Sequence, residues 1–269
     1  MSDSSAAKAQ RFLALHSGDR PLLMPNPWDA GSAVLLASLG FAALATTSSG
    51  FAATLGRLDG QVSREEALAH ASAVAAATDV PVSADFENGF ADAPGSVASL
   101  VRAAIDGGLS GCSIEDATGR DDDPLYELGP ATERIAAAAE AAQGRLVLTA
   151  RAENYLYDRA DLADTIARLQ AFQEAGADVL FAPGLTSAAD IRAVVTSVDR
   201  PVNVLALQGT PPVAELAELG VARISVGGSF AFAALGALVD AATELRDAGT
   251  YGYRALSAKG SAAARRAFT

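Results

Sequence analysis

Short apolar runs rich in β-forming residues alternate with longer alanine-rich stretches along most of this chain. Alternation of this kind predicts buried strands separated by helices. The predicted strands lie at residues 22–25, 41–46, 80–85, 111–115, 146–151, 178–182, 202–207 and 222–226. The predicted helices lie at residues 63–78, 131–142, 161–175, 187–197 and 229–248. Ser63 followed by Glu66 forms a capping-box pattern at the first of these helices.

Eight strands alternating with helices predict a single α/β domain, a (β/α)8 TIM-type barrel spanning residues 1–269. The alternative is a doubly wound open sheet, which needs a glycine-rich phosphate loop after an early strand. No G-x-G-x-x-G or P-loop motif is present, and no proline-rich or serine-rich linker divides the chain. Residues 229–269 form a long apolar helix and a short arm, which is typical of an oligomer contact or of a frayed end.

The composition excludes several classes of protein. Half of the residues are hydrophobic and 19% are charged, which allows a large buried core and excludes a disordered or fibrous chain. The formal net charge is −12 and no basic cluster is present, so no nucleic-acid partner is expected. The opening residues lack the apolar segment of a signal peptide, and no apolar run approaches the length of a membrane span. We therefore expect a cytoplasmic protein with no membrane partner.

The scarcity of some residue types narrows the possible chemistry. The chain has two histidines and one cysteine, and its lysines are confined to Lys8 and Lys259. These numbers exclude an intramolecular disulfide and an all-cysteine metal site. They also leave few groups for a Schiff-base lysine, a Ser–His–Asp triad or a zinc–histidine site. Chemistry in the middle of the chain must use carboxylates, arginine, hydroxyls, backbone amides or a metal ion.

Polar side chains gather where the predicted strands end, which is where barrel enzymes build their active sites. Because side chains alternate along a strand, Asp85 and Glu87 can face one cavity, and Glu115 from the neighbouring strand end can join them. Three converging carboxylates repel one another unless a cation lies between them. Ligation by oxygen alone favours a hard ion, with Mg²⁺ as the default and Mn²⁺ as the alternative.

Each of these features also has a purely structural interpretation. The acids at the strand ends could cap the helices that follow them, because acids favour helix N-termini. Arg151 suits the carboxylate or phosphonate of an anionic substrate, but it could instead pair with Glu153 or Glu115. The polar run 46–50 is either an anion-binding nest or a plain turn. The two histidines, His16 and His70, and the buried thiol of Cys112 are expected to be surface or packing groups.

Four motifs, taken in their order and spacing, resemble the isocitrate lyase/phosphoenolpyruvate mutase superfamily. They are NPWDAGSAVLLASLGFAALATTSSGFAATLGRLDG, PVSADFENGF, GCSIEDATG and LTARAENYL, and the resemblance covers residues 12–248. The resemblance implies a modified barrel whose eighth helix is swapped onto a neighbouring subunit, and hence a homodimer or homotetramer. It also implies small anionic substrates, 2-oxo acids or their 2-hydroxy-acid adducts, which chelate Mg²⁺ and react through a metal-held enolate.

The resemblance assigns metal-site roles by motif. Asp85 would be the principal metal-site acid, with Glu87 and Glu115 binding the ion directly or through water. Asp59, in the LGRLDG stretch, matches an acid that supports the waters of the metal. Glu115 and Asp59 are therefore expected among the catalytic residues.

The same resemblance assigns the substrate contacts. Thr47, Ser48 and Ser49 lie in the loop whose amides would hold the substrate carboxylate, and Asp85 would lie beside it. Arg151 would act in catalysis by contacting an oxygen or the departing portion of the substrate. Asn203 is a further match for a substrate-binding residue.

The loop after the fourth predicted strand departs from the family pattern. Isocitrate and methylisocitrate lyases carry a catalytic cysteine there in a Lys-Lys-Cys-Gly-His sequence, and phosphonopyruvate enzymes carry a lysine and an asparagine. Residues 117–126 read ATGRDDDPLY, so all of these groups are missing. Arg120 and Tyr126 are the remaining candidates for a gate or a proton donor.

Three hypotheses follow. The first is a Mg²⁺-dependent enzyme that breaks or forms a carbon–carbon bond next to a 2-oxo acid, as a lyase, decarboxylase or hydrolase. The second is a P–C bond mutase or hydrolase acting on phosphonopyruvate-like substrates. The third is a barrel that binds 2-oxo acids without turning them over.

Overall fold

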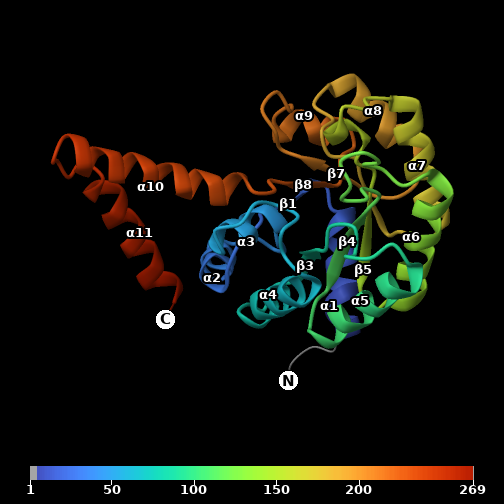
Figure 1. Cartoon of the computed structure of the whole chain (residues 1–269), viewed down its shortest axis with the longest axis horizontal. Helices are drawn as coiled ribbons and strands as arrows, with labels where there is room; N and C mark the ends of the chain where they lie inside the picture. The colour runs from blue at the N-terminus through green and yellow to red at the C-terminus, as the bar shows by residue number, and fades with distance from the viewer. Residues whose placement is uncertain (1–4, 269) are drawn as a thin grey trace.

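The computed structural model describes residues 5–268, which form a (β/α)8 barrel (Figure 1). Its eight parallel strands are hydrogen-bonded in the order β1-β8-β7-β6-β5-β4-β3-β2. They are β1 (Leu22–Met24), β2 (Leu44–Ala45), β3 (Val82–Asp85), β4 (Gly111–Glu115), β5 (Val147–Arg151), β6 (Val179–Phe181), β7 (Val202–Leu205) and β8 (Arg223–Ser225). Each strand lies inside a run predicted from the sequence. Because consecutive strands neighbour one another around the ring, the doubly wound alternative is excluded.

The ring is completed by residues that follow β1. The amide of Ala45 donates to the carbonyl oxygen of Pro25 at 3.2 Å, which links the first two strands. Asn26 is buried and joins both neighbours of β1. Its Nδ2 donates to the carbonyl oxygen of Thr46 at 2.9 Å, and its Oδ1 accepts from the amide of Val226 at 3.0 Å. One buried amide side chain therefore ties together the carboxyl-terminal rim of the barrel.

Helices surround the strands. They are α1 (Ser5–Ala14), η1 (Leu15–Ser17), α2 (Ala30–Ser38), α3 (Ser48–Thr54), α4 (Arg64–Ala76), α5 (Pro94–Asp106), α6 (Leu128–Ala142), η2 (Asn154–Tyr157), α7 (Leu162–Glu174), α8 (Ala188–Ser197), α9 (Val213–Glu218), α10 (Ser229–Asp247) and α11 (Arg254–Ala267). The five helices predicted by apolar spacing are confirmed. Within residues 5–268, no helix is long and apolar enough to cross a membrane.

Two of the helices begin with reciprocal capping boxes. Ser63 accepts from the amide of Glu66 at 3.3 Å, and the Glu66 carboxylate accepts from the amide of Ser63 at 2.9 Å, as the sequence predicts. Asp29 accepts from the amide of Ser32 at 2.6 Å and caps α2 in the same way. These bonds satisfy amides that the first turn of a helix leaves without partners. They fix where α2 and α4 begin.

The amino-terminal end of the barrel is closed by α1. Phe12 is fully buried in a cluster that includes Leu22, Met24 and Val147 from the strands. Gly111 allows this close approach, because a Cβ there would lie 2.7 Å from the Phe12 ring. This apolar cluster fills the amino-terminal end of the barrel, so polar side chains can occupy the carboxyl-terminal part of its interior.

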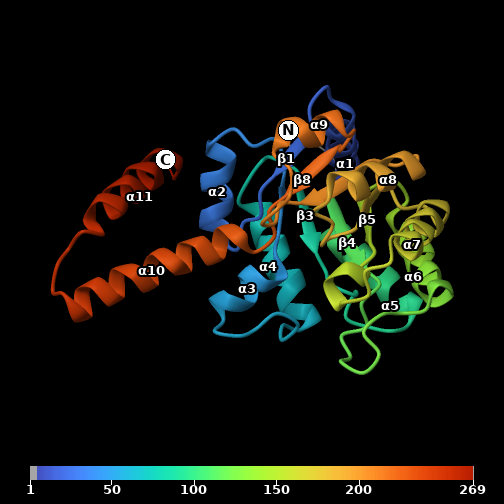
Figure 2. The ribbon, with the colours of Figure 1, turned by 90° about the horizontal axis from the view of Figure 1, so that it is seen from above.

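The two C-terminal helices stand apart from the barrel (Figures 1 and 2). α10 projects outward after β8, and α11 folds back toward α2. Ala231 is the only buried residue in these two helices as the structure describes them. Large apolar side chains on α10 are exposed instead, Leu238 and Val239 at 62% each. A single chain therefore leaves an apolar surface of α10 uncovered.

Candidate active site

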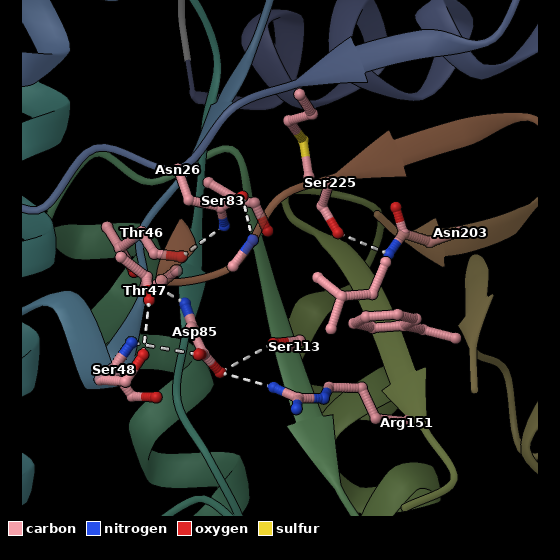
Figure 3. A pocket seen from close by; sticks show the side chains of 18 of the residues that line it. Asn26, Thr46, Thr47, Ser48, Ser83, Asp85, Ser113, Arg151, Asn203 and Ser225 are labelled. Atoms are coloured by element: carbon pink, nitrogen blue, oxygen red, sulfur yellow. Dashed lines mark hydrogen bonds and ion pairs between the residues drawn. The ribbon is translucent and has the colours of Figure 1, made fainter. Parts of the chain in front are cut away.

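Two adjoining cavities occupy the carboxyl-terminal end of the barrel, and Figure 3 shows the residues of the inner one. The inner cavity has a volume of about 190 Å³ and is lined by residues that include Asp85, Ser113, Asn203, Arg223 and Ser225. The outer cavity has a volume of about 420 Å³ and is lined by residues that include Glu87, Glu115, Arg120, Glu153 and Tyr157. Ser48, Asp59 and Arg151 line both cavities. The two cavities therefore form one continuous candidate site.

Asp85 ends β3 and is held from several directions. Its Oδ2 accepts from the amide of Ser48 at 3.2 Å, and its Oδ1 accepts from Ser113 Oγ at 3.4 Å. Arg151 Nη1 lies 2.9 Å from the same Oδ1. The Asp85 amide donates to Thr46 Oγ1 at 2.9 Å, which ties β3 to the end of β2. These contacts fix the orientation of the carboxylate and leave it facing the inner cavity.

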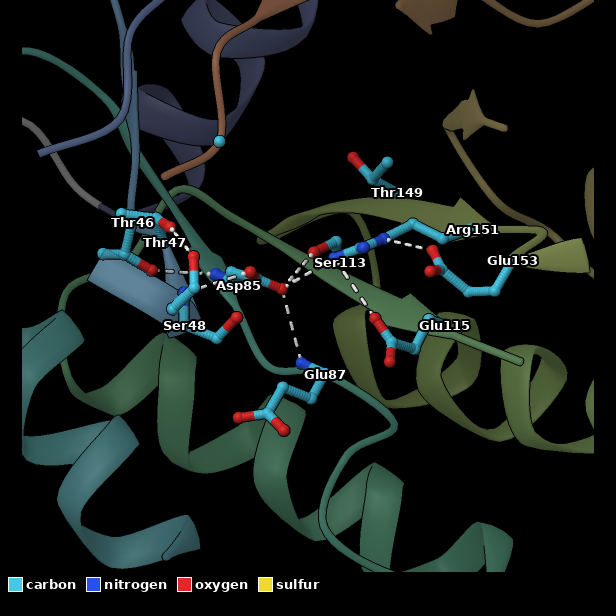
Figure 4. Close-up of polar contacts among 12 residues, drawn as sticks. Thr46, Thr47, Ser48, Asp85, Glu87, Ser113, Glu115, Thr149, Arg151 and Glu153 are labelled. Atoms are coloured by element: carbon cyan, nitrogen blue, oxygen red, sulfur yellow. Dashed lines mark hydrogen bonds and ion pairs between the residues drawn. The ribbon is translucent and has the colours of Figure 1, made fainter. Parts of the chain in front are cut away.

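Arg151 ends β5 and is shared by three carboxylates (Figure 4). Nη1 contacts Asp85 and also Glu115 Oε2 at 3.2 Å, while Nε contacts Glu153 Oε1 at 2.8 Å. The guanidinium also lies 5.3 Å from the centre of the Phe181 ring. The pairing of Arg151 with Glu153 and Glu115, expected as its structural alternative, is therefore present. Its position between the two cavities leaves the guanidinium within reach of a ligand as well.

Burial, and after it repulsion between neighbouring acids, raises the pKa of Glu87, Glu115 and Glu153. Burial and the charges of Asp85 and Asp59 raise the pKa of Glu87 to about 8. Burial also raises the pKa of Glu153 to about 7, against the opposing effect of Arg151. The pKa of Glu115 is raised by burial and by neighbouring carboxylates, although Arg151 opposes the shift. These buried acids therefore hold their protons to a higher pH than exposed carboxyl groups do.

A buried ion pair beneath the site supports Glu153. Asp116 is 2% exposed, and its Oδ1 accepts from the amide of Glu153 at 2.8 Å. Arg168 of α7 lies 3.0 Å from Asp116 Oδ2 and donates to the carbonyl oxygen of Tyr126 at 2.9 Å. Asp116 and Arg168 therefore connect the loops after β4 and β5 and position the carboxylate that holds Arg151.

The polar loop after β2 lies against Asp85. Thr47 caps α3 by accepting from the amide of Gly50 at 3.3 Å, and its hydroxyl lies 3.2 Å from Ser49 Oγ. Ser48 lines both cavities and donates its amide to Asp85. Asp59 reaches the same boundary from the loop after α3, and partial burial raises its pKa. The loop is therefore more than a plain turn, because it borders the cavities and binds Asp85.

Glu87 has a left-handed backbone, with φ of 47°. Its amide donates to Asp85 Oδ1 at 3.4 Å, and Figure 4 shows its side chain turned away from Arg151. Its carboxylate lines the outer cavity. Asp85 and Glu87 thus contribute to adjoining parts of the site, although they are only two residues apart.

The helix-capping interpretation of the strand-end acids is wrong. The helix that follows β3 begins after Ala93, and the helix that follows β4 begins after Glu127. Neither residue makes a side-chain capping bond. The acids at positions 85, 87, 115 and 116 lie well before these helices. Asp85, Glu115 and Asp116 are held by Arg151, Arg168 or main-chain amides instead, and Glu87 lines the outer cavity.

The donor set fits a hydrated Mg²⁺ better than a fully protein-ligated ion. Within residues 5–268, no three carboxylate, imidazole or thiol groups are arranged as a complete ligand set. Mg²⁺ commonly keeps several waters and takes one or two carboxylates from the protein. Three carboxylates contact the single guanidinium of Arg151, and Asp59 and Glu87 line the same pair of cavities, so acids outnumber bases here and a divalent cation would balance them. Direct ligation by Asp85, Glu87 and Glu115 together would require Arg151 to move from between two of them.

Several residues of the site do not follow from the sequence patterns described above. Asn203, predicted to bind substrate, lines the inner cavity; its Nδ2 donates to Ser225 Oγ and its Oδ1 accepts from Arg223 Nε, both at 2.9 Å. Tyr157, at the end of η2, lines the outer cavity, and burial raises its pKa to about 12. The signal for the buried polar groups was the two-residue spacing of polar side chains within apolar runs, as in Arg223 and Ser225.

The loop after β4 is tied to the neighbouring loop. Arg120 lies 3.2 Å from Asp92 Oδ1, and the Tyr126 hydroxyl donates to the same carboxylate. Arg134 lies 4.3 Å from the centre of the Tyr126 ring. Arg120 also lines the outer cavity, so it remains a candidate for a gating residue. The Tyr126 hydroxyl is directed to Asp92, and neither residue lines the outer cavity.

Comparison with known proteins decides the family. The family model of phosphoenolpyruvate phosphomutase (PEP mutase) matches residues 12–246. This chain belongs to the PEP mutase family. An uncharacterized member from Mycobacterium tuberculosis (strain H37Rv) is 32% identical, with 88% of this chain and 89% of the relative covered. The 2-methylisocitrate lyase of Escherichia coli K12 is 29% identical, with 78% and 74% covered.

Solved structures of the PEP mutase/isocitrate lyase superfamily share the fold. A Burkholderia cenocepacia J2315 protein, named for the lyase/mutase class, is 54% identical with a TM-score of 0.91, covering 94% of this chain and 92% of that one. A 2,3-dimethylmalate lyase is 28% identical with a TM-score of 0.83, covering 93% and 90%. A phosphonopyruvate hydrolase with bound oxalate and Mg²⁺ is 25% identical with a TM-score of 0.82, covering 90% and 88%. This PEP mutase family member therefore has relatives that act as lyases and as hydrolases.

Proposed function

We propose that this chain is a Mg²⁺-dependent enzyme that breaks or forms a carbon–carbon bond next to the 2-oxo group of a small anionic acid. The observation that carries the proposal is the fixed carboxylate of Asp85, held by Ser48 and Arg151 at the mouth of a polar cavity. Carboxylates with a purely structural role are not normally gathered in excess around one arginine, because mutual repulsion and desolvation both destabilise their charged forms. A cation and an anionic ligand together balance the site.

A divalent cation, when bound, supplies Lewis-acid polarisation of the 2-oxo group of the substrate. Asp85 is the direct protein ligand in this proposal. Glu87, Glu115 and Asp59 act on the waters around the ion, in keeping with their places along the outer cavity. Mn²⁺ has the same preference for oxygen ligands and is the expected substitute.

The chain itself binds and orients the substrate. Thr47, Ser48 and Ser49 present hydroxyls and main-chain amides beside Asp85, which suits the carboxylate next to the 2-oxo group. Arg151 offers its planar guanidinium at the boundary of the cavities, where developing negative charge on the substrate would be stabilised. Glu115 and Glu153 hold that guanidinium in place.

The choice of carbon–carbon chemistry is supported by the relatives and limited by one departure. A 2-methylisocitrate lyase and a 2,3-dimethylmalate lyase are among the related proteins. Residues 117–126 lack the cysteine expected of the isocitrate-type lyases, so a thiol cannot protonate the product here. Tyr157 faces the outer cavity, and its pKa of about 12 means that its hydroxyl keeps its proton at neutral pH. We assign it as the candidate donor in place of the thiol.

A turnover panel tests the proposal. The protein is incubated with Mg²⁺ and, separately, oxaloacetate, 2-methylisocitrate, 2,3-dimethylmalate or phosphonopyruvate, with chelator as the control. The expected result is Mg²⁺-dependent cleavage of oxaloacetate, 2-methylisocitrate or 2,3-dimethylmalate, with release of a 2-oxo acid or another carboxylic acid fragment. Inorganic phosphate from phosphonopyruvate alone would assign P–C bond chemistry instead. Saturable binding of these acids with no product from any of them would identify a non-catalytic binding protein.

The active form is proposed to be a homodimer or homotetramer. The exposed apolar side chains of α10 lie on a helix that the rest of the chain leaves uncovered. Contiguous apolar surface of this kind is typical of a protein–protein contact. Exchange of α10 and α11 between subunits would cover it without altering the barrel.

A further inference from the structure

The interior of this barrel is unusually polar directly beneath Arg151. Barrel interiors are commonly filled by bulky branched side chains. Here the inner cavity and its surroundings carry hydroxyl and amide groups from β3, β4, β5, β7 and β8, namely Ser83, Ser113, Thr149, Asn203 and Ser225. Arg223, the first residue of β8, lies among them and is 3% exposed. A buried cation at this depth needs an explanation.

Every partner of Arg223 that the structure describes is electrically neutral. Nε donates to Asn203 Oδ1 at 2.9 Å, and Nη2 donates to Thr149 Oγ1 at 3.2 Å. Nη1 lies 3.3 Å from His16 Nε2, and His16 Nδ1 is bonded to a main-chain carbonyl oxygen, so Nε2 is the acceptor. Among residues 5–268, no carboxylate oxygen lies within ion-pair distance of Arg223. Burial and the charge of Arg151 lower the pKa of Arg223 to about 9, so it still carries a positive charge at neutral pH.

Three other arginines with low exposure are held by carboxylates or by main-chain carbonyl oxygens. Arg168 pairs with Asp116 and Asp164, and Arg151 with three carboxylates. Arg134 donates to main-chain carbonyl oxygens of the loop after β3. A charge buried without an opposite charge is costly. Arg223 is a buried charge of this kind, and it lines the inner cavity.

The inner cavity connects Arg223 to the proposed cation site. The cavity is lined by Arg223 and Ser225 as well as by Ser48, Asp85 and Arg151. A guanidinium has five N–H groups, and the three bonds described above leave two of them available. A ligand chelated near Asp85 can therefore extend toward an unpaired cation with donors to spare.

We propose that Arg223 binds a second carboxylate of the substrate inside the barrel, so that the enzyme selects 2-oxo acids or adducts with an anionic tail. This inference rests on the proposed function, which places the first carboxylate and the 2-oxo group near Asp85. The tail carboxylate supplies the opposite charge that Arg223 lacks. Asn203 and Thr149 position the guanidinium, and Ser225 holds Asn203 through its amide.

Calorimetric titration with matched ligands tests the inference. The full-length protein with Mg²⁺ is titrated with oxaloacetate and with 2-oxosuccinamate, in which an amide replaces the distal carboxylate. The expected preference for oxaloacetate is about 10-fold or more, as for a charge-assisted hydrogen bond in a desolvated site. In Arg223→Met the preference disappears, while the affinity for oxalate, which has no tail, changes less than about twofold. Arg102→Met is the matched control, since it removes an exposed guanidinium on α5 that lines neither cavity, and it is expected to keep the preference.

Two results would overturn the inference. Equal affinity of the wild type for the two ligands is one, and an unchanged preference in Arg223→Met is the other. If Arg223→Met does not fold, a crystal structure of the wild type with Mg²⁺ and oxaloacetate tests the inference instead. A distal carboxylate bound at Arg223 supports it, and one bound elsewhere overturns it. Failure of oxalate itself to bind with Mg²⁺ would count against the proposed function and is thereby distinguished from failure of the tail site.

Discussion

Arg151 Nη1 lies between two carboxylates, 2.9 Å from Asp85 Oδ1 and 3.2 Å from Glu115 Oε2. These acids end two adjacent strands, and the arginine ends the next strand in the ring. Glu153 occupies the remaining side of the guanidinium. The arginine therefore keeps apart carboxylates that would otherwise repel one another, and it leaves them positioned for a cation.

Replacing Glu115 by glutamine should stabilise the protein. Glu115 is buried among other carboxylates, which raises its pKa, so its ionised form is unfavourable in the folded state. At pH 8 we expect Glu115→Gln to raise the Tm by about 3 °C while lowering turnover. Thermal unfolding followed by circular dichroism measures the shift, with exposed Glu133→Gln as the control that leaves Tm unchanged. A fall in Tm on loss of the Glu115 charge would contradict this electrostatic description.

Loss of Arg168 should strongly destabilise the chain. Its partner Asp116 is 2% exposed, and Arg168→Met would leave that carboxylate buried without an opposite charge. We expect the free energy of unfolding to fall by about 3 kcal/mol or more, as for other broken buried ion pairs. Urea unfolding measures the change. Arg57→Met, which breaks the exposed pair with Glu66, is the matched control and should have a much smaller effect.

The stability of the protein should depend on His16 in mildly acidic solution. Burial and the charge of Arg223 lower the pKa of His16 from 6.5 to about 4. The unfolded chain therefore takes up a proton near pH 6.5, whereas the folded chain does so only near pH 4. The contribution of neutral His16 to the free energy of unfolding is fully present above pH 6.5. It should fall by about 3 kcal/mol as the pH drops to 4. Urea unfolding across this range should show a shallower decline in His16→Gln than in the wild type, and equal slopes would exclude His16 as the cause.

The apolar surface of α10 should control assembly. Leu238 and Val239 are 62% exposed in the single chain. Replacing both by glutamate would place charge in the proposed contact, so we expect the wild-type dimer or tetramer to become a monomer. Size-exclusion chromatography with light scattering measures the mass. Asp240→Asn on the same helix is the control that should retain the assembly, and a monomeric wild type would refute the proposed contact.

Much of the barrel could be predicted because each strand lies in a short run rich in apolar and β-forming residues. Strands in a closed parallel barrel are covered by helices outside and by other strands' side chains inside, so their sequences stand out from the alanine-rich helices. α5 lacks a side-chain N-cap, and the short α9 has only one buried residue, so neither had a comparably strong signal. The roles of Asp85 and Arg151 as neighbours also followed, because both end predicted strands.

The contacts within the site were less accessible to prediction. Arg223 shares one face of its strand with Ser225, but that spacing does not say which side chains meet the guanidinium. Its partners His16 and Thr149 are far away in sequence and meet only when the barrel closes. The same holds for Asn26, whose bonds join the ends of the ring. The left-handed turn at Glu87 likewise separates its carboxylate from Asp85 in a way that strict strand alternation does not anticipate.

The most direct test is a calorimetric titration of Mg²⁺ into the protein saturated with oxalate, comparing the wild type with Asp85→Asn. Asparagine preserves the shape of the side chain and removes the charge that is proposed to bind the cation. We predict saturable binding to the wild type and an affinity about 100-fold lower or worse in Asp85→Asn. Asp92→Asn, which changes an exposed acid outside the cavities, should bind as the wild type does. Equal Mg²⁺ affinity in the wild type and Asp85→Asn would contradict the proposed cation site.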